Sequence, residues 1–338
     1  MSSERKKSFL SKKMHLETEI LSSNREGTAR AAQILNAGGL VAFPTETVYG
    51  LGADCTNPAA IEKIYKAKGR PAHNPLIIHV YDAKEASKFV QMVPKATKLA
   101  DSFWPGPLTL VLEQKTNLKI EIAERALSKL STVAVRVPTH PIAREILSLC
   151  KSPIAAPSAN MSGKLSTTRF EDVLECLSGK VNAIVDGGPC PIGVESTIVK
   201  VENGNVFILR PGKITLKDIK TLIGEVKKID RANNKDITSP GQLSSHYCPE
   251  TPIRLNVLEP RGNELLLAFG PLPVGVKGLS LSEISDPDEA AMNLYSALAD
   301  LDHLAKITKS NSIGINPIPE SGIGSAIIDR LRRAATKS

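Results

Sequence analysis

Apolar positions with helical spacing alternate with short apolar runs along the first two thirds of the chain. Helical spacing and end signals predict helices over residues 28–39, 57–69, 96–104, 141–150 and 169–179. Short apolar or alternating runs predict strands over residues 40–44, 75–80, 108–113, 132–138, 153–157 and 182–186. Residues 196–212 predict a hairpin, because two strand runs flank a turn that contains Asn-Gly. This alternation predicts one α/β unit with a mixed sheet over residues 25–222.

The pattern breaks after residue 222 and restarts near residue 251. Residues 224–238 are polar and aperiodic, and the turn-rich stretch 239–249 follows, so we expect an interdomain linker over residues 223–250. Beyond it lie predicted strands at 252–259, 264–270 and 312–317 and predicted helices at 288–308 and 326–336. They indicate a small second α/β domain of βαβ type over residues 251–338. Residues 1–24 are expected to form a basic N-terminal extension.

Composition and charge narrow the class of protein. Hydrophobic residues make up 41% of the 338 residues, which is enough for sizeable cores. The formal net charge of +8 favours anionic partners such as nucleotides or RNA. The five cysteines are scattered without CxxC spacing, which argues against a zinc site and for reduced thiols. No apolar run approaches the roughly eighteen residues of a membrane span, so we expect a cytoplasmic protein without a membrane role.

The familiar nucleotide and hydrolase motifs are missing from the sequence. It contains no P-loop, GxGxxG fingerprint, HExxH pair or GxSxG elbow. Instead, four polar clusters follow predicted strands, where ligands of open α/β sheets usually bind. They are PTETVYGLG at 44–52, YKAKGRPAHNPLIIHV at 65–80, AAPSANMSG at 155–163, and GGPCPIGVESTIVK at 187–200 with LRPG at 209–212.

The residue types in these clusters suit an anion and a small polar substrate. Lys68 and Arg70 are two residues apart, so in an extended or turn segment both can lie on one side and bind phosphate. Ser196 and Arg210 are hairpin neighbours, so we expect them to lie close together. Each cluster alone is compatible with a capped turn or a solvated surface. Together they predict one ligand site at the strand ends.

These clusters resemble the YrdC-like family, in the longer two-domain form of the threonylcarbamoyl-AMP synthases. The matching segments are FPTETVYGLGAD, KGRPAHNPLIIHV, FWPGPLTLVL, VAVRVPTH, APSANMSG and VESTIVK, with SPGQLSSHYCP as the interdomain motif. The resemblance covers nearly the whole chain from about residue 25. It implies a twisted, open mixed sheet with helices and a concave basic site, plus a small Rossmann-like α/β C-terminal domain.

The resemblance also implies a reaction and a set of site residues. L-threonine, bicarbonate and ATP would give threonylcarbamoyl-adenylate and pyrophosphate, for the modification of an adenosine beside the tRNA anticodon. Lys68 and Arg70 would be catalytic, and Mg²⁺ would be carried by the ATP phosphates without dedicated protein ligands. The ATP site would comprise Lys68, Arg70, Asn74, Thr132, Ser158, Asn160, Ser166, Arg210, His246 and Tyr247. The threonine site would comprise Thr47, His79, Arg136, Ala156 through its backbone, and Ser196.

The implied chemistry needs no protein nucleophile, because the protein would position the substrates and neutralise charge. A labile carbamate favours a closed site, and we expect residues 239–249 to act as a lid through His246 and Tyr247. One alternative is an RNA-binding module without ATP chemistry, although only 4% of residues are aromatic and base stacking is poorly provided for. A second alternative is a carbamoyl-transfer or maturation factor on the same domain. Contact with tRNA or with the threonylcarbamoyl transferase stays open.

Overall fold

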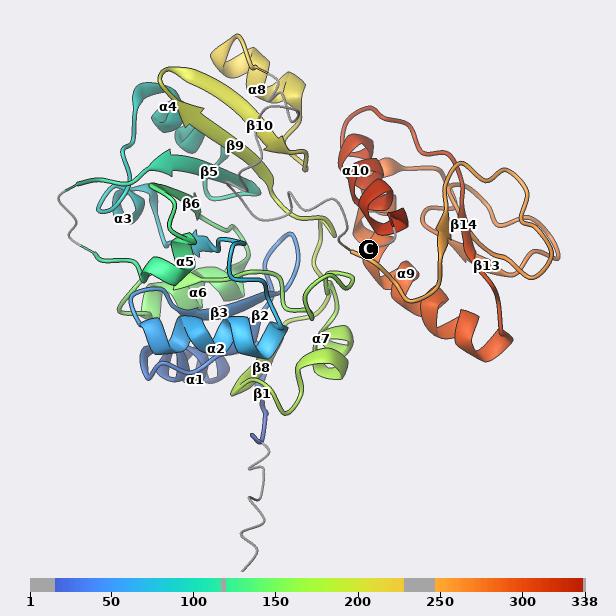
Figure 1. Ribbon diagram of the computed structural model, residues 1–338, viewed down its shortest axis with the longest axis horizontal. Helices are drawn as coiled ribbons and strands as arrows, with labels where there is room; N and C mark the ends of the chain where they lie inside the picture. Colours follow the sequence, from blue (N-terminus) through green and yellow to red (C-terminus); the bar gives the residue numbers. More distant parts are fainter. Residues whose placement is uncertain (1–15, 117–119, 228–246, 337–338) are drawn as a thin grey trace, which may run out of the picture.

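The computed structural model describes residues 16–116, 120–227 and 247–336, which form a larger and a smaller α/β part (Figure 1). The larger part is built on a ten-stranded sheet in the order β1-β8-β2-β3-β7-β4-β6-β5-β9-β10. Its strands are β1 (Glu19–Ser22), β2 (Val41–Phe43), β3 (Gly50–Asp54), β4 (Ile77–His79), β5 (Leu108–Glu113), β6 (Thr132–Arg136), β7 (Ile154–Ala155), β8 (Ala183–Asp186), β9 (Thr197–Glu202) and β10 (Asn205–Arg210). Parallel and antiparallel pairs both occur, which confirms the predicted mixed sheet.

The helices of this part lie close to the predicted ranges. They are α1 (Arg25–Asn36), α2 (Pro58–Lys68), α3 (Ala83–Ala86), α4 (Pro94–Phe103), α5 (Glu124–Leu127), α6 (Pro141–Leu149), α7 (Phe170–Leu177) and α8 (Leu216–Ile223). The short helices α3 and α5 and the late helix α8 have no counterpart among the predicted ranges. The apolar sides of α2, α4 and α7 pack on the sheet in one extended core that includes Ile61, Leu99 and Val173, and those of α1 and α6 pack in a second core.

The helix α2 begins and ends at its sequence signals. Asn57 caps it by accepting hydrogen bonds from two backbone N–H groups of the first turn. Gly69 ends it in the left-handed conformation, at φ 61°. Lys68 is therefore the last helical residue, which confirms the predicted helix for Lys68, and Lys68 and Arg70 do not share an extended or turn segment. The helical pattern of the sequence extends as far as Gly69, so the helix ends only after Lys68.

The hairpin of β9 and β10 is confirmed. Asn203 and Gly204 both have positive φ, 50° and 73°, as a two-residue turn between twisted strands requires. The strands pair in antiparallel fashion with Arg210 opposite Ile198. The residues that precede β9 therefore lie beside the residues that end β10, which places the two segments of the fourth polar cluster next to each other.

The extension predicted over residues 1–24 ends earlier than expected. Glu19–Ser22 forms β1, which pairs in parallel with β8 at the edge of the sheet. Leu21 is the one buried residue of this strand, so its sequence carries almost no hydrophobic pattern. Backbone pairing with an existing sheet edge holds it. The strand β3 was also not predicted from the sequence, because two of its five residues are glycines. The structure requires the glycine at position 52, since a side chain there would collide with Phe43.

The smaller part confirms the expected second α/β domain. Its four-stranded parallel sheet has the order β11-β14-β12-β13. The elements are β11 (Ile253–Arg254), β12 (Leu265–Ala268), β13 (Gly278–Ser280), α9 (Pro287–Thr308), β14 (Ile313–Ile315) and α10 (Gly324–Ala335). The strand expected over residues 252–259 is shorter because Asn256 has a positive φ of 56°, which ends the extended backbone. The division of the chain at residues 222 and 251 stays a prediction.

The helices α9 and α10 lie on the side of the small sheet that faces the larger part (Figure 1). Leu294, Leu298 and Leu301 of the predicted apolar face of α9 are buried in the core of the smaller part. Among the residues that the structure describes, no helix combines the length and the apolar character needed to cross a bilayer.

Candidate active site

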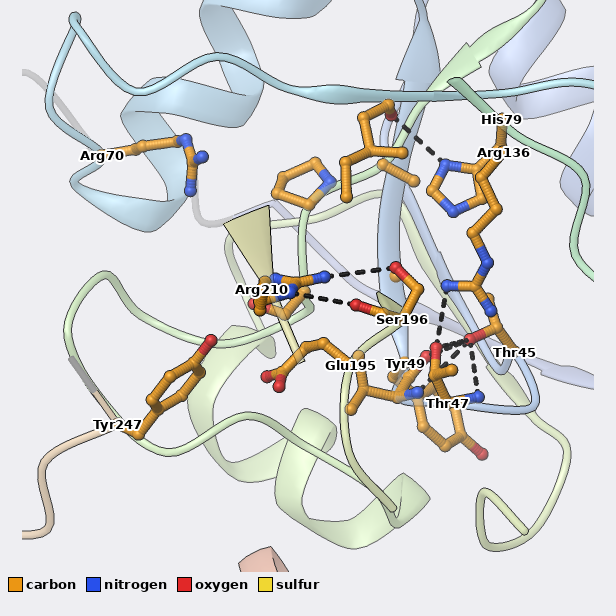
Figure 2. A pocket seen from close by; sticks show the side chains of 16 residues that line it. Thr45, Thr47, Tyr49, Arg70, His79, Arg136, Glu195, Ser196, Arg210 and Tyr247 are labelled. Atoms are coloured by element: carbon orange, nitrogen blue, oxygen red, sulfur yellow. Dashed lines mark hydrogen bonds between the residues drawn. The ribbon is translucent and has the colours of Figure 1, made fainter. Parts of the chain in front are cut away.

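Residues of all four polar clusters meet at one cavity. The cavity opens to solvent, and Figure 2 shows the side chains that line it. Residues of the loop after β2, of the turn after β7 and of the loop before β9 line it, together with Arg70, Arg136 and Arg210. Nine of the predicted site residues line the cavity: Thr47, Arg70, His79, Arg136, Ala156, Ser158, Ser196, Arg210 and Tyr247. The strand ends thus form a single concave basic site, as the sequence indicates.

Arg136 dominates one end of the cavity. It ends β6 and is buried, and its Nη1 donates a hydrogen bond to Thr47 Oγ1 at 2.9 Å. Its Nη2 lies 2.7 Å from Glu46 Oε1, so the guanidinium and this carboxylate form a buried ion pair. Its Nε has no hydrogen-bond partner among the described residues. A buried guanidinium with an N–H group that lacks an acceptor is suited to binding a carboxylate.

His79 lies beside Arg136 and carries no charge near neutral pH. Its Nδ1 is 3.2 Å from the backbone oxygen of Ile77. Burial, together with the positive charge of Arg136, lowers the pKa of His79 to about 3. The imidazole can therefore serve as a neutral hydrogen-bonding group at this end of the cavity.

Ser196 and Arg210 lie next to each other, as their hairpin positions predict. Arg210 Nε donates to the backbone oxygen of Ser196 at 3.1 Å, and Arg210 Nη2 donates to Ser196 Oγ at 3.2 Å. The same Oγ lies 2.7 Å from Thr109 Oγ1 of β5. Burial lowers the pKa of Arg210. The serine hydroxyl and the guanidinium are thus held at fixed positions on the cavity wall.

Lys68 and Arg70 occupy different positions, although the sequence pairs them. Arg70 lines the cavity, and its Nε and Nη2 donate to the backbone oxygens of Asn74 and Pro75 at 3.0 and 2.8 Å. Lys68 is buried behind the turn after β7, where its Nζ donates to the backbone oxygens of Ser158, at 2.6 Å, and of Asn160. Burial and the nearby Arg70 charge lower the pKa of Lys68 to about 7, and burial lowers that of Arg70 to about 10.

Four more predicted residues lie outside the cavity lining. Asn74 is buried beside Arg70, and Thr132 starts β6 opposite Glu113. Asn160 accepts a hydrogen bond from Ser158 Oγ. Ser166 Oγ donates a hydrogen bond to Glu195 of the same domain at 2.6 Å. His246 lies outside the described residues.

Tyr247 lines the cavity at the edge of the predicted lid. Its side chain is 1% exposed, and its ring centroid lies 5.6 Å from that of Tyr295 in α9. Tyr247 thus reaches the site from the linker, as Figure 2 shows. It also packs on the smaller part.

Glu195 and its partners in the C-terminal domain have no predicted role. The Glu195 carboxylate lines the cavity and accepts hydrogen bonds from Tyr295 in α9 and Arg330 in α10. The charges of Arg330 and Arg210 outweigh the opposing effect of burial and lower the pKa of Glu195 to about 2. Arg330 lies 135 positions further along the chain, so no local sequence pattern could connect it with this cavity.

The carboxylates at the cavity are unsuited to hold a metal ion by themselves. Glu46 is paired with Arg136, and Glu195 is paired with Arg330. Over the described ranges, no group of three His, Cys, Asp or Glu side chains could hold a metal. A divalent cation would fit this donor set only on the oxygens of an anionic ligand. The three arginines of the lining make the cavity a binding site for anions.

Family models match both parts of the chain. A Sua5, YciO and YrdC model described as "Telomere recombination" matches residues 33–212, and one described as "Threonylcarbamoyl-AMP synthase, C-terminal domain" matches residues 214–336. A threonylcarbamoyl-AMP synthase of Bacillus subtilis is 40% identical, covering 94% of this chain and 95% of the relative. One of Pyrococcus abyssi is 39% identical, covering 90% of this chain and 93% of the relative.

Solved structures match the same arrangement of domains. The crystal structure of P. abyssi Sua5 complexed with L-threonine has a TM-score of 0.85 at 35% identity, covering 94% of this chain and 98% of that chain. A P. abyssi Sua5 variant, in which a histidine and the tyrosine that follows it are alanines, has a TM-score of 0.84, also at 35% identity, and covers 94% and 96% of the two chains. Since both parts match and relatives align along nearly the whole length, the chain belongs to the Sua5/YrdC family, in the two-domain form of the threonylcarbamoyl-AMP synthases.

Proposed function

We propose that this protein converts L-threonine, bicarbonate and ATP to L-threonylcarbamoyl-adenylate with release of pyrophosphate. The observation that carries the proposal is one cavity with guanidinium groups at both ends: Arg136 beside Thr47 at one, and Arg70 with Arg210 at the other. The names of the relatives and the threonine in the P. abyssi complex support it. The product would supply the threonylcarbamoyl group of an adenosine next to the tRNA anticodon, through a separate transferase, in the cytoplasm.

Arg136 would bind the carboxylate of threonine. Its Nε, which has no hydrogen-bond partner among the described residues, offers a donor for a charge-assisted hydrogen bond to that carboxylate. The hydroxyls of Thr47 and Ser196 and the neutral imidazole of His79 would recognise the threonine side chain and amine, with the backbone of Ala156 beneath them. A substrate without the hydroxyl would leave buried polar groups unpaired, which disfavours its binding.

Arg70, Arg210 and Ser158 would bind the phosphates of ATP at the other end. Lys68 would hold the turn from Ser158 to Asn160 in place from behind, since it donates to the backbone oxygens of both residues. Asn74, Thr132, Asn160 and Ser166 remain proposed members of the ATP site, outside the cavity lining. Mg²⁺ bound to the phosphate oxygens would offset their negative charge.

The proposed reaction needs substrate placement more than a reactive side chain. The threonine amine attacks the carbon of bicarbonate, and water leaves to give the carbamate. A carbamate oxygen then attacks the α-phosphorus of ATP, and pyrophosphate leaves. The chain would hold the two anions at fixed positions and neutralise the developing charge with its guanidinium groups. Tyr247 and the linker would exclude water from the labile carbamate.

Pyrophosphate release tests the proposal, with threonine and bicarbonate each omitted in turn. We expect release to require both, and Arg70→Met to lower kcat/KM for ATP by about tenfold or more. Arg30→Met is the matched control, because Arg30 is an exposed arginine paired with Glu19 far from the cavity. Release without threonine, or none with all three substrates, would overturn the synthase function. Salt-sensitive tRNA binding without pyrophosphate release would favour the RNA-binding alternative.

A further inference from the structure

One buried carboxylate joins the cavity to the C-terminal domain. Glu195 is 6% exposed and lies in the loop before β9. It accepts hydrogen bonds from Ser166 Oγ at 2.6 Å, from the Tyr295 hydroxyl at 3.1 Å and from Arg330 Nε at 2.7 Å. Two of these three donors belong to the C-terminal domain, so this domain completes the hydrogen bonding of a group in the cavity wall.

Arg330 contacts both loops that present the proposed ATP and threonine ligands. Its side chain is completely buried, and its Nη2 donates to the backbone oxygen of Pro211 at 3.0 Å. Pro211 directly follows Arg210, and Glu195 directly precedes Ser196. One side chain of α10 therefore holds the start of β9 and the end of β10 in register, at the point where Arg210 donates to Ser196.

The charge of Glu195 would oppose an anionic ligand if it stood alone. The carboxylate lines the same cavity as Arg70 and Arg210, and electrostatic repulsion is strong at a buried site of low dielectric. The guanidinium of Arg330 makes the pair neutral overall. Asp329 lies 2.7 Å from Arg330 Nη1, and Arg333 lies 3.0 Å from the same carboxylate, so Asp329 has a second cation of its own.

We propose that Arg330, supported by Tyr295, is a positioning residue for nucleotide binding: it neutralises Glu195 and orients the loops of Ser196 and Arg210. The inference rests on the proposed function for the identity of the anion, ATP. It gives the C-terminal domain a part in the site itself, in addition to carrying one end of the linker.

Other ion pairs between the domains differ from this one. Arg169 lies 2.8 Å from Asp300 of α9, but the side chains are 32% and 49% exposed. Exposed pairs of this kind contribute little to stability. Arg169→Met therefore removes an interdomain arginine without leaving a buried charge at the cavity, which makes it the matched control for Arg330→Met.

The test measures ATP and threonine affinities by titration calorimetry on the full chain. Arg330→Met leaves Glu195 charged and without its cation, so we expect the Kd for ATP to rise by tenfold or more. The Kd for threonine should change by less than about threefold. Glu195→Gln in the Arg330→Met background removes the charge, and should return the Kd for ATP to within about threefold of the parent. Arg330→Lys keeps the charge and should bind ATP nearly as well as the parent.

Tyr295→Phe provides a milder variant in case Arg330→Met does not fold. It keeps the ring and removes one donor to Glu195, and we expect a Kd for ATP about two- to fourfold higher. The inference is wrong if Arg330→Met and Tyr295→Phe bind ATP like the parent, if Arg169→Met weakens ATP binding as much as Arg330→Met, or if Glu195→Gln gives no recovery. A parent protein that binds threonine but not ATP would instead overturn the proposed function, and the inference with it.

Discussion

Replacing Arg136 by methionine should lower both the stability of the larger domain and its affinity for threonine. A second substitution, Glu46→Gln, should then restore the stability but not the affinity. Arg136 and Glu46 form an ion pair at 2.7 Å, and each side chain is 4% exposed. Without the guanidinium, Glu46 keeps one hydrogen bond, from the backbone N–H of Thr139 at 3.2 Å. The variant therefore contains a buried carboxylate whose charge is largely uncompensated.

The expected magnitude follows from this burial. Removing one partner of a buried ion pair costs about 3–5 kcal/mol, and the remaining Thr139 contact favours the lower value of about 3 kcal/mol. In Glu46→Gln/Arg136→Met neither partner is charged, so the free energy of unfolding should return to within about 1 kcal/mol of the parent. Both variants lack the guanidinium, and a loss of about 3 kcal/mol in binding raises the Kd for threonine about 150-fold.

Trp104 makes the stability assay selective for the larger domain. It is the single tryptophan of the chain, and its Nε1 donates to the backbone oxygen of Leu108 at 2.7 Å. Its fluorescence during urea unfolding should give the free energy of unfolding, and calorimetry gives the threonine affinity. The reasoning is refuted if Arg136→Met is within about 1 kcal/mol of the parent. It is also refuted if the double variant is as unstable as the single one.

Three further predictions concern the linker and two buried bases. Replacing His246 and Tyr247 by alanine should lower turnover without changing the Trp104 unfolding curve, and unchanged kinetics would refute the lid. Folding lowers the pKa of Lys68 from 10.5 to about 7, so between these pH values the Lys68 amine is protonated in the unfolded chain and mostly neutral in the folded chain. The free energy of unfolding should therefore rise with pH over this range. Urea midpoints should show that rise in the parent, and a slope unchanged in Lys68→Met would contradict it. The pKa of His79 falls from 6.5 to about 3 on folding, so stability should fall as the pH drops from 6.5 towards 3. His79→Gln should reduce that loss in acid unfolding curves, and an identical loss would contradict the assignment.

The elements with strong local signals were predictable from the sequence. The Asn57 cap, the Gly69 end of α2 and the Asn203-Gly204 turn each act within a few residues, so local backbone preferences decide them. The strand β1 was not predictable, because Leu21 is its one buried side chain and its pairing partner lies far along the chain.

The site residues also divide into those that the sequence indicated and those whose positions only the tertiary structure decided. The sequence alone indicated the clusters at the strand ends, the nearness of Ser196 and Arg210 and, through the family resemblance, most of the cavity lining. Tertiary structure decided that Lys68 supports the turn after β7 from behind while Arg70 lines the cavity.

Tertiary structure also brought Arg330 of α10 against Glu195, across 135 positions of the chain. Local patterns report on neighbours within one element, and hairpin spacing reports on adjacent strands. A contact between domains depends on how two finished cores dock. For this reason the arginines at the two ends of the cavity could be expected from the sequence, but the neutralisation of Glu195 by the C-terminal domain could not.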